Sequence, residues 1–232
     1  CGYDDCYPNV LPANPRWGGE AGLIELSNAA RQAGYLFALH ENYVDMYPNA
    51  EDFAPDLLAL TPQGDPVPAW FNRTTGIQSF LLSPPASREV AARFAPEIHR
   101  RYHTSAIYLD VSTAVNPSEK VDYNAAVDGN ARLHTTLEAY HQLLEYERQA
   151  HQSPVIGEGG HHLLYAGVVD AVKQRDEVVV LGVVDDDEPV LTAGIDEVAL
   201  PFVADGAAEL QLADHDRVRH GLRRPAPGEG GA

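Results

Sequence analysis

The pattern of hydrophobic and polar positions predicts strands and helices that follow one another along the chain. Short apolar runs, rich in β-branched and aromatic residues, are typical of buried strands. They predict strands at 35–40, 106–112, 154–158, 178–184 and 195–202. Apolar residues at helical spacing predict helices at about 20–33, after Pro85, at 124–150 and at 163–173.

Two further features interrupt this alternation. The range 57–70 is expected to form a hairpin around Gly64 and Asp65, and a short strand is expected at 80–82. Pro96 lies inside the helix that follows Pro85, and we expect it to kink or divide that helix.

Strands that alternate with helices favour an α/β fold with a parallel sheet. The number of strands fits most of a (β/α)8 barrel of the TIM type, which typically needs about 250 residues. Since the chain has 232 residues, we expect a partial barrel domain at 1–213, incomplete at its amino end, and a flexible polar tail at 214–232. A doubly wound open sheet is the alternative, although the sequence has no glycine-rich phosphate loop.

The composition limits the classes of molecule that this domain is expected to bind. Asp and Glu number 34 against 16 Lys and Arg, a net charge of −18, which disfavours nucleic acid as a partner. No run approaches the roughly 18 apolar residues of a membrane span. The sequence begins at Cys1 inside an apparent motif, so we expect a fragment. A secreted or periplasmic location stays open. The oligomeric state stays open as well. Cys1 and Cys6 allow a disulfide, but their spacing is no disulfide framework and two free thiols are favoured.

Two of the predicted strands carry a carboxylate near their carboxyl ends, Asp110 and Glu158. A lone carboxylate in a buried strand costs several kcal/mol, whereas the carboxyl ends of parallel strands are where α/β folds place their chemistry. An Asp110 that only caps the following turn is the alternative. Paired carboxylates are what glycoside hydrolysis requires, one ionised and one protonated. The pair therefore indicates a glycoside hydrolase.

Other polar and aromatic residues gather at the ends of strands and in loops. Asp4 and Asp5 lie near the start, and His40, Asn42 and Asp45 follow the first predicted strand. Aromatic residues in the loops either stack on sugar rings or simply pack there: Tyr3, Tyr7, Trp17, Tyr43, Tyr47 and Trp70.

At these positions the sequence resembles a known family. The segments 2–19, 39–50 with Phe53, and 108–111 are similar to the catalytic barrel of endo-α-N-acetylgalactosaminidases, glycoside hydrolase family 101, and of the related family 129. The pattern His-x-Asn-x-x-acid-x-Tyr-Pro at 40–48 aligns without gaps, and the resemblance covers about residues 2–160. This chain departs from the family in having Tyr3 and Tyr7 in place of histidines and Asp45 in place of glutamate.

The resemblance implies a retaining α-glycosidase that acts on α-linked (N-acetyl)hexosamine or hexose glycans. Asp110 would be the nucleophile and Glu158 the general acid/base, and this mechanism needs no metal or cofactor. Sugar hydroxyls would be held by polar residues, and the rings by aromatic ones. The expected substrate-binding residues are Asp4, His40, Asn42, Asp45, Tyr47 and Trp70.

Two other functions stay open on the sequence. His161 and His162, with His40 and acidic residues, are the ligand types of a metal-dependent barrel hydrolase. A noncatalytic carbohydrate-binding barrel would keep the loop aromatics. The acidic run at 185–188 resembles a calcium site only loosely, and a solvated turn is favoured. The remaining histidines are expected at the surface, at helix ends or in the tail: His99, His103, His134, His141, His151, His215 and His220.

Overall fold

A computed structural model describes residues 5–174 and 177–180, and its centre is a five-stranded sheet in the order β1-β5-β6-β7-β8. Its strands are β1 (Ala38–Glu41), β5 (Ala106–Leu109), β6 (Val155–Glu158), β7 (Ala171–Gln174) and β8 (Glu177–Val180). The first four pair in parallel, which confirms an α/β fold with a parallel sheet. The expectation of parallel pairing throughout is wrong for β8, which pairs with β7 in the antiparallel direction.

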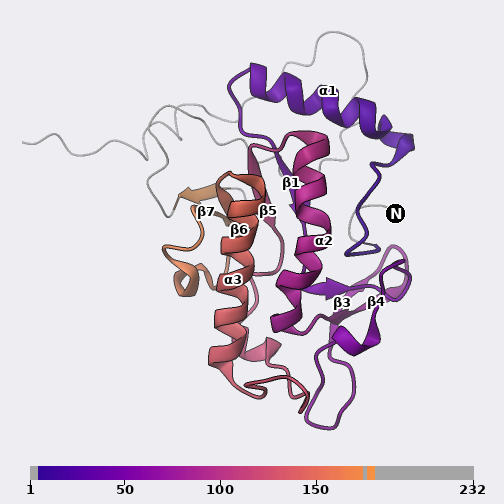
Figure 1. The fold of residues 1–232 in the computed structure, drawn as a ribbon, viewed down its shortest axis with the longest axis vertical. Coiled ribbons are helices and arrows are strands. Elements are labelled where there is room, and N and C mark those ends of the chain that lie inside the picture. The colour runs from indigo at the N-terminus through magenta and orange to yellow at the C-terminus, as the bar shows by residue number, and fades with distance from the viewer. Residues whose placement is uncertain (1–4, 175–176, 181–232) are drawn as a thin grey trace, which may run out of the picture. The chain divides into compact units, whose positions relative to one another are not determined.

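In the described part of the chain, three α-helices accompany the sheet, α1 (Gly19–Gln32), α2 (Pro84–Tyr102) and α3 (Leu133–His151). Figure 1 shows α2 and α3 side by side across one face of the strands, and α3 contacts both β5 and β6. The apolar face of α3 meets the sheet through Tyr140, Leu143 and Leu144, which are fully buried with Ile107 and Leu109 of β5. Each such side chain contributes roughly 1.5–3 kcal/mol when it leaves water, so this layer fixes the position of β5.

A second, three-stranded antiparallel sheet lies beyond β1 in the chain. It consists of β2 (Asp45–Met46), β3 (Pro68–Asn72) and β4 (Ile77–Leu81), in the order β2-β4-β3. The hairpin expected around Gly64 and Asp65 is present, with an antiparallel bridge between Leu60 and Pro66. A second hairpin, which joins β3 to β4, turns at 73–76. The Asn72 side chain explains this turn, because its Oδ1 accepts the backbone N–H groups of the two residues at 74 and 75.

Other boundaries differ from the sequence expectation for local reasons. Helix α2 runs unbroken through Pro96, because the buried side chains on both sides of the proline, among them Phe94 and Ile98, hold the helix against the core. The segment 111–132, expected to be helical from 124, is irregular apart from a 3-10 turn. The segment at 163–173 holds a 3-10 turn followed by β7, not a helix. The strand expected at 178–184 is described only as far as residue 180, and the strand expected at 195–202 and the tail lie outside the described residues.

Short 3-10 turns complete the described chain, at Pro15–Trp17, Pro55–Leu57, Pro117–Lys120 and His162–Tyr165. Every helix in the described part of the chain is too short or too polar to cross a membrane. Cys6 is disulfide-bonded, so the expectation of free thiols is wrong for this residue.

Candidate active site

The register of the central sheet brings Asp110 and Glu158 together. Strands β5 and β6 are neighbours, and Leu109 lies opposite Gly157, so the next residue along each strand is one of the two carboxylates. The backbone N–H of Asp110 donates to the carbonyl oxygen of Glu41 at 2.9 Å, which continues the ladder to β1. The two residues therefore share the carboxyl edge of the sheet, where parallel α/β folds bind ligands.

Val111 connects the two carboxylates and a buried lysine. Its backbone N–H donates to Glu158 Oε2 at 3.0 Å, and its carbonyl oxygen accepts from Lys120 Nζ at 2.7 Å. To make both bonds Val111 adopts a left-handed conformation with φ of 61°. That conformation costs a β-branched residue roughly 1–2 kcal/mol, so the turn after Asp110 is held by its neighbours rather than by its own preference.

His40 reaches Asp110 from β1. Its Nε2 lies 3.5 Å from Asp110 Oδ2, and its Nδ1 lies 2.6 Å from the hydroxyl of Tyr7. The rings of Tyr7 and His40 are stacked with centroids 5.8 Å apart, and Tyr108 borders the imidazole on another side at 5.3 Å. When Nε2 carries the hydrogen, the Tyr7 hydroxyl donates to Nδ1 and the imidazole donates to Asp110, in one connected chain.

Asn42 forms a second support for the same carboxylate. Its Nδ2 donates to Asp45 Oδ2 at 2.9 Å and to Asp110 Oδ2 at 3.4 Å. Its Oδ1 accepts the backbone N–H groups of Val44 and Asp45 at 2.8 and 3.0 Å, which fixes the side chain in a local turn. Asn42 and Asp45 are both buried. The predicted residues His40, Asn42 and Asp45 thus meet around Asp110.

The surroundings of Asp110 favour its ionised form. Burial alone would raise its pKa, but the hydrogen bond and charge of His40, together with hydrogen bonds from Glu158 and Val111, hold that pKa below its ordinary value. The arrangement places an aspartate with a lowered pKa beside a second carboxyl group, that of Glu158.

Lys120 is a site residue that the sequence reading missed. It is 3% exposed, and its ammonium group lies 4.9 Å from the centre of the Tyr140 ring. Burial lowers the pKa of Lys120 to about 8, although the negative charges of Asp45, Glu158 and Asp110 oppose the shift. The only signal in the sequence is that Lys120 is one of two lysines in a strongly acidic chain.

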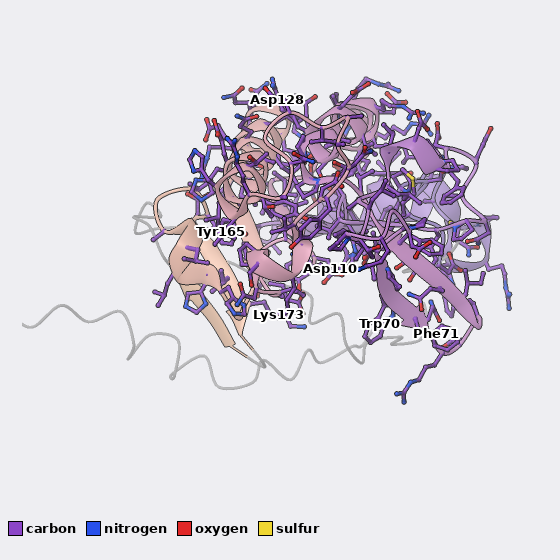
Figure 2. The ribbon with its side chains drawn as sticks, turned by 90° about the horizontal axis from the view of Figure 1, so that it is seen from below. Trp70, Phe71, Asp110, Asp128, Tyr165 and Lys173 are labelled. Carbon is purple, nitrogen blue, oxygen red and sulfur yellow. The ribbon has the colours of Figure 1, made fainter. Side chains whose placement is uncertain are left out.

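The other predicted substrate-binding residues are spread more widely. Tyr47 is fully buried and packs behind Tyr7 with ring centroids 6.4 Å apart. Trp70 lies on β3 and is 56% exposed. Figure 2 shows Asp110 with Lys173 on one side and the hairpin residues Trp70 and Phe71 on the other. Asp4 lies outside the described residues.

The rival metal site does not assemble around the predicted histidines. His161 Nδ1 is 2.9 Å from the carbonyl oxygen of Ala114. Within residues 5–174 and 177–180, no group of three possible metal ligands includes His40, His161 or His162. The acidic run at 185–188 lies outside the described residues.

The fold is similar to that of an α-glycosidase. The chain matches the ligand-free α-N-acetylgalactosaminidase NagBb from Bifidobacterium bifidum with a TM-score of 0.64 and 22% identity, over 76% of this chain and 30% of that one. The complex of NagBb with Gal-NHAc-DNJ matches with a TM-score of 0.65 and 23% identity, over 76% and 27% of the two chains. The GalNAc complex matches with a TM-score of 0.62 and 24% identity, over 72% and 26%.

These matches confirm, at the level of the fold, the likeness to α-N-acetylgalactosaminidases that the sequence motifs predicted. The chain spans less than a third of the length of these NagBb chains. No protein-family model and no curated protein matches the sequence.

Proposed function

We propose that this chain carries the catalytic pair of a retaining α-glycosidase that acts on α-linked N-acetylhexosamine or hexose glycans. The observation that carries the proposal is the position of Asp110, with its lowered pKa, beside Glu158 at the ends of adjacent parallel strands. The likeness of the fold to an α-N-acetylgalactosaminidase supports the same reaction. In this proposal residues 1–213 form part of a (β/α)8 barrel, to which β1, β5, β6 and β7 contribute, and residues 214–232 are a tail.

The reaction would proceed by double displacement. The Asp110 carboxylate attacks the anomeric carbon, the glycosidic C–O bond breaks, and Glu158 gives its proton to the departing oxygen. The carboxylate of Glu158 then removes a proton from water, which attacks the anomeric carbon and frees Asp110 with the sugar configuration retained. Retaining enzymes hold their carboxyl groups about 5–5.5 Å apart. The sugar would therefore enter between the two groups and replace the hydrogen bond that joins them.

The neighbouring residues would orient the nucleophile. His40 and Asn42 both contact Oδ2 of Asp110 and would fix the orientation of its carboxylate. Asp45 and Asp4 would hold sugar hydroxyls, and exposed Trp70 would stack on a more distant ring. Because Tyr47 is fully buried, it would act through Tyr7 and His40 rather than by touching the sugar.

The test is hydrolysis of p-nitrophenyl α-N-acetylgalactosaminide and α-galactoside by the full chain. Proton NMR identifies the anomer that is released first, and we expect the α-anomer. Asp110→Asn should remove turnover while sugar binding, measured by calorimetry, persists. Asp128→Asn is the matched control, since Asp128 is an exposed loop residue at the upper edge of the molecule in Figure 2, away from Asp110.

Each other outcome would favour a different function. Early release of the β-anomer would contradict the retaining mechanism, and equal turnover by Asp110→Asn would exclude Asp110 as nucleophile. Sugar binding without hydrolysis by the unaltered chain would indicate a noncatalytic carbohydrate-binding domain. Loss of turnover in His161→Asn, with Asp110→Asn still active, would indicate the metal-dependent hydrolase.

A further inference from the structure

A second group of ionisable side chains lies on the helix side of the sheet. Glu41 follows His40 in β1, and because successive strand residues point to opposite faces, its carboxylate points away from the candidate active site. There it meets Glu147 and His151, which are one turn apart on α3. All three side chains are at most 1% exposed.

The distances within this group are those of a metal site. His151 Nε2 lies 3.3 Å from Glu41 Oε1 and 3.4 Å from Glu147 Oε2, and one donor atom from each residue lies within 4.8 Å of the others. Zinc binds imidazole nitrogen and carboxylate oxygen at about 2.0–2.2 Å in tetrahedral geometry, which puts neighbouring ligand atoms roughly 3.3–3.5 Å apart. The two contacts of His151 therefore fit around one shared ion.

The atoms that face one another lack hydrogen bonds. Glu41 Oε1, both carboxylate oxygens of Glu147 and His151 Nε2 are buried and make no hydrogen bond of good geometry, although His151 Nε2 lies at ion-pair distance from both carboxylates. A buried polar atom without a partner costs roughly 1–3 kcal/mol, and more when it is charged. A protonated His151 would offer one N–H to two carboxylates, which leaves part of their charge unmatched. A divalent cation would neutralise both carboxylates and engage all three residues.

The outer atoms of the same side chains do have partners. The Tyr43 hydroxyl donates to Glu41 Oε2 at 2.6 Å, so Oε1 is left to face the group. His151 Nδ1 lies 2.7 Å from Thr104 Oγ1. A bond from the Nδ1 hydrogen to this oxygen places the lone pair of His151 on Nε2, toward the carboxylates. Supporting bonds of this kind are what orient metal ligands in known sites.

We propose that Glu41, Glu147 and His151 bind one zinc ion between β1 and α3. A ligand set of one imidazole and two carboxylates suits Zn²⁺ and is unlike the all-oxygen sets of Mg²⁺ and Ca²⁺. The ion would connect β1, which carries His40, to the helix that supports β5. This role is structural and lies outside the proposed glycosidase chemistry, so the two proposals succeed or fail separately.

The test is zinc binding by the full chain after refolding. Because the three ligands are buried, the chain is unfolded in chelator and refolded with or without Zn²⁺, and bound zinc is counted by mass spectrometry of the elements. We expect one zinc per chain and a higher melting temperature with zinc. Co²⁺ in place of Zn²⁺ should give the visible absorption of a tetrahedral site.

Two variants assign the ion to these residues. Glu147→Gln should weaken zinc binding by on the order of 100-fold or more, whereas Glu138→Gln should bind like the unaltered chain, because Glu138 is in an exposed pair with His134 on the same helix. Thr104→Val keeps every ligand and removes the support of His151, together with the hydrogen bond between the same hydroxyl and His99 Nδ1, and should weaken zinc binding by about 10–100-fold. It decides the assignment even if Glu147→Gln fails to fold.

Three results would overturn the proposal. The first is a refolded chain that holds no zinc, and the second is equal zinc binding by Thr104→Val and Glu138→Gln. The third is stabilisation by Ca²⁺ or Mg²⁺ but not by Zn²⁺. None of these results changes the expected loss of turnover in Asp110→Asn, which depends on the opposite face of the sheet.

Discussion

Glu158 is the residue whose role depends most directly on its proton. As the general acid it would contribute about 10²–10⁴-fold to the rate, and more when the leaving group is poor. We expect Glu158→Gln to lower kcat by about 10²–10⁴-fold on an alkyl α-glycoside and by much less on the p-nitrophenyl α-glycoside, whose leaving group departs without protonation. Steady-state kinetics on the two substrates measures the difference. An equal loss on both would show that Glu158 only positions Asp110.

The burial of Lys120 predicts that the free energy of unfolding depends on pH. The pKa of a lysine in an unfolded chain is about 10.4, and burial lowers that of Lys120 to about 8 in the folded protein. Below pH 8 the ammonium group is charged in the folded and in the unfolded chain, and its burial lowers the stability of the folded protein. Between pH 8 and 10.4 the folded state loses its proton first, so stability rises with pH. The stability gained when Lys120 loses its proton is fully present above about pH 10.4 and is lost as the pH falls to 8.

The reference for this effect is Lys120→Met, which has no proton to lose. The free energy of unfolding of the unaltered chain, relative to this variant, should rise by about 2 kcal/mol between pH 7 and 9.5. Urea denaturation at both pH values measures it. Lys120→Arg, which stays charged in this range, should serve as an equivalent reference. A difference that is flat with pH would mean that Lys120 is solvated.

At the scale of elements, the end of β6 is fitted against the loop that follows β5. A Cβ atom added to Gly157 would lie 2.5 Å from Thr113 Oγ1 and 2.9 Å from its Cγ2, and that hydroxyl also donates to the carbonyl oxygen of Glu158. Gly157→Ala should therefore destabilise the fold by about 1–3 kcal/mol. In the background of Thr113→Ala the same change should cost less, because the clashing atoms are gone. Additive losses in urea denaturation would contradict this contact.

The strands could be predicted because their apolar runs are short and β-branched, and adjacency of Asp110 and Glu158 followed from parallel order. The turn at Gly64 and Asp65 could be predicted from its turn residues. The second hairpin turn, at 73–76, was missed because the Asn72 side chain organises it. The buried zinc-ligand candidates were also missed. Glu147 and His151 lie on the same face of α3 as the buried Tyr140 and Leu144. The helical spacing of that face therefore indicates that Glu147 and His151 are buried, although neither is apolar.

At the same scale, the roles of Val111 and Lys120 could not be predicted from the pattern. A positive φ at a valine depends on two hydrogen bonds from residues far away in the sequence, and no local preference signals it. Likewise, His40 and Asp45 were expected to touch sugar because they follow a strand. The structure adds that both contacts to Asp110 Oδ2 come from the segment 40–42, a detail that depends on side-chain rotamers.

For the whole molecule, the net charge of −18 predicts a dependence of stability on salt. Repulsion among acidic groups favours the unfolded chain, and salt screens it, since the Debye length falls from about 30 Å at 0.01 M to about 8 Å at 0.15 M. Salt also weakens favourable ion pairs, such as that of Arg148 with Asp170 and those of Arg101 with Glu97 and Glu20. Such partly exposed pairs contribute only about 0–1 kcal/mol each, so the repulsion should dominate.

The melting temperature should accordingly rise by a few degrees between 0.01 and 0.3 M NaCl, as expected for a gain of about 1 kcal/mol in a chain of this size. Scanning calorimetry at a series of NaCl concentrations measures it. Screening is nearly complete above about 0.3 M, so the curve should level off there, whereas a general salting-out effect would continue to rise. A melting temperature that falls from the lowest concentration onward would mean that the ion pairs around α2 and α3 outweigh the excess of acidic groups.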